Sequence, residues 1–243
     1  RRFRSITNTQ AVDNLKKVQQ HEATGLEDWK KRALHFVGGD NTNLTNLIAS
    51  YMGTYETLFK DTLMGGQVFT YQKNTTAPIQ TNISDSIINT INNGASIINF
   101  FGPGSEQGFD QAIDDPSVFN NQSKYPLLIS NSCYSGNIYI YGRRSVSERY
   151  TYTKNKGSIA FIATSSIGFP YSLNNFTWNF YKSLTSTKYN QGIGNMMQEA
   201  ITNAIFSGDE LTQFTALDMA LNGDPSLKIT CGNLPDYPIK NNN

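Results

Sequence analysis

Short apolar runs alternate with segments of helical periodicity along most of this chain, and this alternation restricts the possible folds more than any other feature. The apolar runs cover residues 33–37, 67–71, 96–101, 127–132 and 158–164. The helical segments cover residues 8–23, 44–63, 84–91, 145–152, 175–184 and 193–206, and the first has Ala11, Leu15 and Val18 at helical spacing. Runs that are apolar on both faces are typical of parallel strands with helices on each side. The sequence therefore predicts a three-layer α/β/α domain with a mostly parallel sheet of about six strands.

The charge balance excludes two classes of partner. The chain has 20 Lys and Arg residues against 19 Asp and Glu residues, which gives a net charge of +1, and neither half is strongly one-signed. Nucleic-acid and anionic-membrane surfaces need clustered basic residues. No apolar run approaches the roughly 18 residues that span a bilayer. We therefore expect neither a nucleic-acid partner nor a membrane span.

The length of the chain allows one large domain or two small ones. Its 243 residues are enough to bury a core, and we assign residues 1–232 to the domain and residues 233–243 to a polar tail. The chain begins on Arg1 without a Met, so we interpret it as a processed or excised piece of a longer protein. The missing signal peptide therefore carries no information about the compartment.

Two loops follow predicted strands, where parallel α/β sheets place their ligands. One is residues 102–105, Gly-Pro-Gly-Ser, and the other is residues 131–136, Asn-Ser-Cys-Tyr-Ser-Gly. A thiol in a small-residue loop at a strand end suits a nucleophile with backbone N–H groups beside it. The alternative is that Cys133 is a buried small hydrophobe, as most free cysteines are. We expect Cys133 and Cys231 to be unpaired.

Six segments in the same order resemble one family. They are residues 4–22, which include Gln19-Gln20-His21-Glu22; 99–105, Asn-Phe-Phe-Gly-Pro-Gly-Ser; 130–136, Ser-Asn-Ser-Cys-Tyr-Ser-Gly; 145–149, Ser-Val-Ser-Glu-Arg; 157–164, Gly-Ser-Ile-Ala-Phe-Ile-Ala-Thr; and 221–228, Leu-Asn-Gly-Asp-Pro-Ser-Leu-Lys. Together they resemble the gingipain family of bacterial cysteine peptidases, whose catalytic domain has a caspase-like fold. The resemblance implies a secreted or cell-surface location and further domains in the parent chain.

The resemblance also assigns positions in the site. Cys133 matches the nucleophile, and Gly104 matches a possible oxyanion N–H donor. Pro103 stands where the family has its catalytic histidine. Since proline has no titratable group, it can neither take the proton of the thiol nor protonate the leaving amine. The sequence therefore predicts a retained scaffold with an incomplete catalytic dyad.

The two histidines of the chain offer poor substitutes for the missing base. His35 lies inside an apolar run, which favours a structural strand histidine. His21 lies near the end of a polar helix, where we expect it to be solvated.

Five acidic residues are weaker candidates. Glu148 follows the cysteine loop and could orient a base, although a single helix carboxylate is usually solvated. Asp40 follows the first strand, where a substrate-pocket carboxylate could lie. Asp114 and Asp115 could contribute to a structural calcium site of the kind that gingipain-type domains carry, but adjacent carboxylates need further ligands. Asp224 precedes a proline, which is typical of an Asx-type turn.

Three functions compete on these observations. The first is a gingipain-like peptidase domain that is degenerate and at most binds a peptide or protein ligand. The second is an active cysteine endopeptidase that uses His35 or a carboxylate as its base. The third is a doubly wound binding domain unrelated to proteases, but Gly38-Gly39-Asp40 does not form a recognisable cofactor loop. The sequence implies no cofactor.

Overall fold

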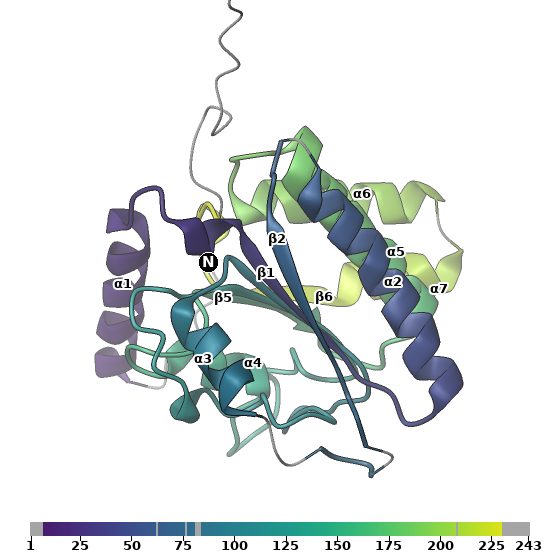
Figure 1. The fold of residues 1–243 in the computed structure, drawn as a ribbon, viewed down its shortest axis with the longest axis horizontal. Helices are drawn as coiled ribbons and strands as arrows, with labels where there is room; N and C mark the ends of the chain where they lie inside the picture. The colour runs from purple at the N-terminus through teal and green to yellow at the C-terminus, as the bar shows by residue number, and fades with distance from the viewer. Residues whose placement is uncertain (1–6, 62, 76, 81–83, 208, 230–243) are drawn as a thin grey trace, which may run out of the picture.

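A six-stranded sheet forms the centre of the molecule in a computed structural model that describes residues 7–61, 63–75, 77–80, 84–207 and 209–229. The strands are β1 Arg32–Val37, β2 Gln67–Gln72, β3 Ile97–Phe101, β4 Leu127–Asn131, β5 Ala160–Thr164 and β6 Met219–Asn222. Their order is β2-β1-β3-β4-β5-β6. All neighbouring strands are parallel except β5 and β6, which are antiparallel. The predicted, mostly parallel sheet is confirmed (Figure 1).

Seven α-helices surround the sheet within the described residues. They are α1 Asn8–Ala23, α2 Thr42–Lys60, α3 Asp85–Asn93, α4 Val146–Tyr152, α5 Pro170–Lys182, α6 Ile193–Ser207 and α7 Glu210–Asp218. Short turns of 3-10 helix occupy Asp28–Lys31 and Pro116–Val118, and a π turn at Ser183–Thr187 extends α5. None of the described helices combines the length and apolarity needed to cross a membrane.

The two faces of the sheet carry separate hydrophobic cores. Successive strand residues point to opposite faces, so Ala33 and Val37 pack with α2, α5 and α6, whereas Leu34 and Phe36 pack with α3 and α4. Figure 1 shows α2 and α5–α7 grouped on one side of the sheet and α3 and α4 on the other. The three-layer α/β/α architecture is therefore confirmed.

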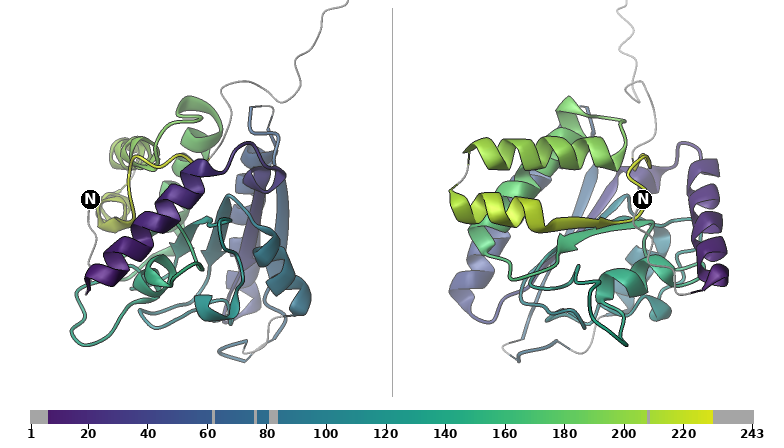
Figure 2. Two further views of the ribbon diagram at one scale, coloured as in Figure 1. Left: turned by 90° about the vertical axis from the view of Figure 1, so that its left-hand side faces the viewer. Right: turned by 180° about the vertical axis from the view of Figure 1, so that it is seen from behind.

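The first helix packs through polar side chains rather than through the predicted apolar stripe. Leu15 is 55% exposed, and the buried residues of α1 are Asn14, Lys17 and His21. The Lys17 ammonium shares its three N–H groups among five main-chain carbonyl oxygens at 2.7–3.5 Å, those of Tyr150, Thr151, Thr153, Lys156 and Ser158. Burial lowers the pKa of Lys17 to about 7. The turn after α4 presents carbonyl oxygens, which are hydrogen-bond acceptors, so a donor side chain such as Lys17 binds there. Helix α1 therefore lies beside α4 (Figure 2).

The segment from α7 to β6 was not predicted as a helix and a strand. Leu211, Phe214 and Leu217 of α7 are exposed, so the apolar positions of this helix do not mark its buried face. Strand β6 has only four residues. The predicted tail at residues 233–243 lies outside the described residues.

Candidate active site

The two predicted loops meet at the carboxyl ends of neighbouring strands. Strands β3 and β4 are parallel, with Phe101 opposite Asn131, so Pro103 and Cys133 each lie two residues past their strands. A Cβ atom on Gly104 would lie 2.9 Å from the Cβ and Oγ atoms of Ser132. The Gly102–Gly104 turn and the cysteine loop therefore lie side by side at the carboxyl edge of the sheet.

The cysteine loop is held tightly against the end of β5. Tyr134 N donates to Ser166 O at 2.7 Å, and Gly136 N donates to Thr164 O at 2.8 Å. Tyr134 has a φ of 57°, a left-handed conformation that is unfavourable for a residue with a side chain. A Cβ atom on Gly136 would lie 2.7 Å from Ala163 O, so only glycine fits there. These constraints fix the backbone on both sides of Cys133.

Three buried serine hydroxyls hydrogen-bond to one another at the base of this loop. Ser130 Oγ lies 2.8 Å from the hydroxyls of both Ser132 and Ser135, and the last two are 3.1 Å apart. Each hydroxyl can donate to the next in a closed ring, which satisfies three buried polar groups without a charge.

The thiol itself is free and half-buried. Gly168 N donates to Cys133 Sγ at 3.4 Å, and Sγ is 3.8 Å from Gly168 O. Within the described part of the chain, Sγ has hydrogen-bond contacts with the backbone of Gly168 alone, and none with an imidazole or carboxylate. Cys231 lies outside the described residues, so its pairing stays a prediction.

Pro103 lines an open cleft. The cleft has a volume of about 520 Å³, and its walls include Pro103, Gly104, Phe109, Asp110 and Asp114. Pro103 O accepts a hydrogen bond from Asp110 N at 3.0 Å, which holds the turn in place. Among the described residues, the N–H groups of Gly104 and Cys133 have no acceptor, as an oxyanion site requires before a ligand binds.

The prediction that His35 is structural is confirmed. It is fully buried in the middle of β1, and His35 Nε2 lies 2.9 Å from Tyr181 Oη. The rings of Tyr55 and Tyr181 pack against it. A polar chain continues from Tyr181 through Asn99 to Asn131, and Thr177 donates to Asn131 Oδ1 at 2.6 Å. His35 is therefore part of the core under α2 and α5.

The prediction that His21 is solvated is wrong. His21 is 3% exposed, and its Nε2 atom lies 2.9 Å from Lys228 O. The polar pattern of α1 misled the prediction, because the buried face of this helix is itself polar. Burial lowers the pKa of His21, and the contact with Lys228 O opposes that shift.

The buried imidazole of His35 makes the fold sensitive to acid. Burial lowers the pKa of His35 from 6.5 to about 3. Between pH 6.5 and about 3, His35 is protonated in the unfolded state but neutral in the folded state. Its contribution to the free energy of unfolding is therefore fully present above pH 6.5 and is lost as the pH falls toward 3. We expect this residue to contribute about 1.4 kcal/mol of lost stability per pH unit in that window. Urea unfolding at pH 7, 6, 5 and 4 measures the free energy of unfolding of the unaltered protein and of folded His35→Gln. This free energy should fall less steeply with decreasing pH in the variant, and equal slopes for the two proteins would contradict the assignment.

The prediction that Glu148 is solvated is also wrong. Glu148 is 2% exposed and accepts a hydrogen bond from Ser145 N at 3.0 Å, which completes a capping box at the start of α4. Ser147 N donates to Ser135 O, so this helix end also braces the cysteine loop. Asp40 is exposed at the start of α2, and its Oδ1 atom accepts from Asn41 at 2.7 Å. Neither carboxylate contacts the thiol.

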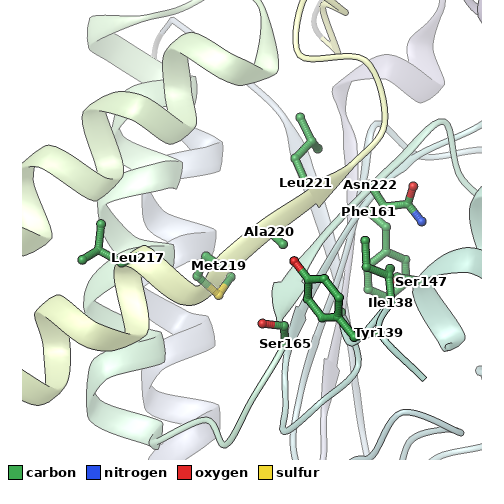
Figure 3. Close-up of a pocket in the computed structure, with 11 residues that line it drawn as sticks. Ile138, Tyr139, Ser147, Phe161, Ser165, Leu217, Met219, Ala220, Leu221 and Asn222 are labelled. Carbon is green, nitrogen blue, oxygen red and sulfur yellow. The ribbon is translucent and has the colours of Figure 1, made fainter. Parts of the chain in front are cut away.

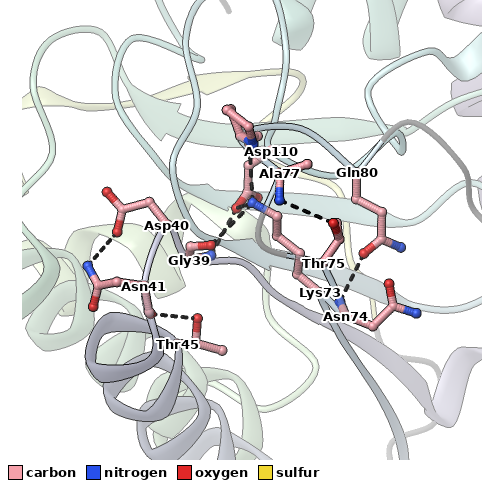
Figure 4. Close-up of polar contacts among 11 residues, drawn as sticks. Gly39, Asp40, Asn41, Thr45, Lys73, Asn74, Thr75, Ala77, Gln80 and Asp110 are labelled. Carbon is pink, nitrogen blue, oxygen red and sulfur yellow. Dashed lines mark hydrogen bonds and ion pairs between the residues drawn. The ribbon is translucent and has the colours of Figure 1, made fainter.

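A buried ion pair next to the cleft was not predicted from the sequence. Lys73 Nζ lies 3.2 Å from Asp110 Oδ2, and Gly39 N donates to the same oxygen at 2.9 Å (Figure 4). Lys73 also donates to Gly39 O and Pro78 O. Burial raises the pKa of Asp110, and the neighbouring Lys73 opposes that shift. The pair links the ends of β1 and β2 to the turn that carries Pro103. A single Asp and a single Lys carry no sequence motif that marks such a pair.

The candidate calcium ligands have other partners. Asp114 lies 3.7 Å from Arg149 Nη2, and Asp115 Oδ1 accepts from Ser117 N. No cluster of three or more His, Cys, Asp or Glu side chains suited to a metal occurs in the described residues. The Asx turn at Asp224 is confirmed, since its Oδ1 atom accepts from Ser226 N at 3.0 Å.

A second, more enclosed cavity lies on the other side of the cysteine loop. It has a volume of about 280 Å³ and is bordered by Gly136, Ser165 and the strand β6 (Figure 3). The loop after β5 is held by Asp218, which accepts from the hydroxyls of Ser165 and Ser166 at 2.5 and 2.7 Å. Asp218 thereby positions the segment that brings Gly168 to the thiol, a role that the sequence did not indicate.

The fold is similar to several solved structures, including a cysteine proteinase. Arg-specific gingipain R (RgpB) matches with a TM-score of 0.72 and 16% identity, over 92% of this chain and 54% of that chain. The complex of Porphyromonas gingivalis RgpB pro- and mature domains matches with a TM-score of 0.69 and 18% identity, over 89% and 53%. The Saccharomyces cerevisiae separase–securin complex matches with a TM-score of 0.56 and 9% identity, over 87% and 13%. This chain thus spans about half the length of the gingipain chains that it matches.

Sequence comparison gives the family. No curated protein matches this chain by sequence. The profile of peptidase family C25 matches residues 2–230, nearly the whole chain. With the caspase-like fold and the ordered strand-end loops, this match shows that the chain belongs to peptidase family C25, the gingipain family.

Proposed function

We propose that this chain is a degenerate gingipain-like peptidase domain that keeps the nucleophile position but lacks the catalytic base. The observation that carries the proposal is the surroundings of the Cys133 thiol. Pro103 lies in the turn that packs beside the cysteine loop at Ser132, and the described hydrogen-bond contacts of Sγ are with the backbone of Gly168.

The missing group matters at two steps of amide hydrolysis. A base must first take the thiol proton so that sulfur can attack the carbonyl carbon, and an acid must then protonate the departing amine. A proline side chain does neither. The N–H groups of Gly104 and Cys133 can still stabilise a carbonyl oxygen, but that interaction does not supply the proton.

The cleft beside Pro103 is the proposed binding site for a peptide or protein ligand. Apolar walls such as Phe109 alternate there with carboxylates and backbone groups, which suits an extended chain. By family resemblance we place the protein outside the cell or on its surface, within a longer parent chain that carries other domains. Asp40 and Glu148 have no catalytic part in this proposal.

An active enzyme with a substitute base is the second candidate, and the geometry disfavours it. A base must reach the thiol proton directly or through one water. His35 is bound to Tyr181 in the core, and Glu148 caps α4. The third possibility, a binding domain unrelated to proteases, is wrong because the family match covers residues 2–230.

Alkylation of Cys133 tests the proposal. An imidazole-activated thiol is largely thiolate at neutral pH and reacts quickly, whereas an ordinary thiol reacts slowly. We expect iodoacetamide to modify Cys133 at pH 7 no faster than it modifies free glutathione, with the Cys133 peptide followed by mass spectrometry. Pro103→Ala serves as the matched control and should react at the same rate. Modification of the unaltered protein about 100-fold faster than glutathione would overturn the proposal.

A further inference from the structure

Residues 137–144 form an exposed loop between the cysteine loop and α4. They have no helical or strand structure, and Tyr139 and Tyr141 are 72% and 97% exposed. Gly142 has a φ of 76°, a conformation that favours glycine. Within the part of the chain that the structure describes, no main-chain hydrogen bond involves residues 140–144. Loops of this kind are preferred sites of limited proteolysis, because a peptidase can bind them without first opening a helix or a sheet.

Two arginines end this loop, and they differ in their surroundings. Arg143 is exposed, and within the described residues it has no hydrogen bond or ion pair. The guanidinium of Arg144 instead lies 5.9 Å from the centre of the Tyr152 ring, a cation–π contact. Arg143 therefore carries a charge that no described carboxylate compensates, and its planar guanidinium suits a carboxylate on another protein.

The start of α4 decides which peptide bond is accessible. Ser145 is buried, and its N–H donates to Glu148 Oε2 at 3.0 Å in the capping box. Cleavage of the bond after Arg144 would require the Ser145 amide to leave this cap. The bond between Arg143 and Arg144 lies one residue further out, and its amide does not belong to the helix cap. The accessible bond is therefore the one after Arg143.

Other exposed basic residues in irregular segments are held by their neighbours. Lys154 is exposed, but carbonyls before and after it in the same turn bind the buried Lys17 ammonium. Lys228 is also exposed, but its carbonyl oxygen lies 2.9 Å from His21 Nε2. A peptidase would have to break these contacts before it could bind either segment in an extended form.

We propose that the Arg143–Arg144 bond is a processing site for an arginine-specific endopeptidase, which converts the domain to a two-chain form. Hydrolysis adds one water across the amide, so residue 143 ends in a carboxylate and residue 144 begins with an amine. The two chains stay together, because β4 and β5 lie on either side of the cut and are paired in the sheet, with Leu127 opposite Ala160. The inference does not depend on whether Cys133 is active.

Limited digestion with trypsin tests the site. Trypsin binds the basic side chain before the scissile bond through a carboxylate, so every Lys and Arg of the chain competes. Within residues 7–229, we expect the first cut to follow Arg143 and to be about tenfold or more faster than any other cut. Mass spectrometry should show one fragment that ends at residue 143 and another that begins at residue 144. The two fragments should elute together from a size-exclusion column without denaturant.

Two variants test the assignment to one residue. Arg143→Gln removes the side chain that the peptidase binds and should slow the first cut about tenfold or more, because the next arginine precedes the capped Ser145. Lys154→Gln is the matched control, since it makes the same change at another exposed basic residue, and it should leave the rate unchanged. Equal thermal midpoints of the variants and the unaltered protein show that the fold is kept.

Three results would overturn the proposal. One is a first cut after Lys154 or Lys228 in the unaltered protein. Another is an unchanged rate of cleavage of this loop in Arg143→Gln, which would assign the site to the bond after Arg144. The third is separation of the two fragments without denaturant, which would show that the cut destroys the domain.

Discussion

Pro103→His is expected to raise the rate of Cys133-dependent peptide hydrolysis by a factor of about 10² or more, because it returns a proton acceptor to the turn beside the cysteine loop. The backbone of this turn is already in place. Asp110 N holds Pro103 O, and Gly104 packs against Ser132. Among the described residues, no acceptor binds the N–H groups of Gly104 and Cys133. Hydrolysis of a fluorogenic peptide set at pH 7.5–8, compared with the unaltered protein, measures the effect.

Two controls define this gain. The double variant Pro103→His with Cys133→Ala should lose all of it, because the histidine then has no thiol to activate. Pro103→Gln fills the position with a side chain that cannot act as a base at this pH, and it should gain nothing. A folded Pro103→His protein with no increase in rate would contradict the assignment of position 103 as the position of the base.

Lys17→Met is expected to destabilise the fold by about 3 kcal/mol or more, since it deletes one buried donor shared by several carbonyls. Tyr150 O, Thr151 O and Ser158 O lose their contact with the ammonium, and these three contacts are buried from solvent. Methionine keeps most of the volume of the side chain, so lost packing adds little. Thermal unfolding at pH 6, where the lysine is charged, should show a midpoint lowered by roughly 6–12 °C.

Lys16→Met is the matched control for this effect. Lys16 is exposed on the same helix, so its replacement should change stability by no more than about 0.5 kcal/mol. Equal stability of the two variants would show that the contacts between Lys17 and the main-chain carbonyls contribute little to the free energy of unfolding. That result would contradict the account of how α1 is held.

The central sheet was predictable because its signal is local. Leu34 and Phe36 face one helical layer while Ala33 and Val37 face the other, so apolar side chains are required on both faces of the strand. The meeting of Pro103 and Cys133 followed from topology, since parallel strands end at one edge. The polar docking of α1 was not predictable, because its partners are main-chain carbonyls that every sequence contains.

The support around the site was also hidden from the sequence. Asp110 and Lys73 are 37 residues apart, and only the fold brings them together at the end of β1. Glu148 is buried because it forms the capping box of α4, the helix whose N-terminal end braces the cysteine loop. The position of Glu148 in the sequence does not distinguish this role from that of a solvated helix carboxylate. Strand β6 is short and follows a helix with an exposed apolar row, so neither element had a periodic signal.

Peptide hydrolysis by the unaltered protein, measured against Cys133→Ala, is the most direct test of the central claim. The substrates are internally quenched peptides with Arg, Lys or an apolar residue before the scissile bond, incubated at pH 7–8. The account predicts that both proteins release product at the same background rate, because Cys133 has no imidazole among its described contacts. Robust turnover that disappears in Cys133→Ala would contradict it and would require a different base.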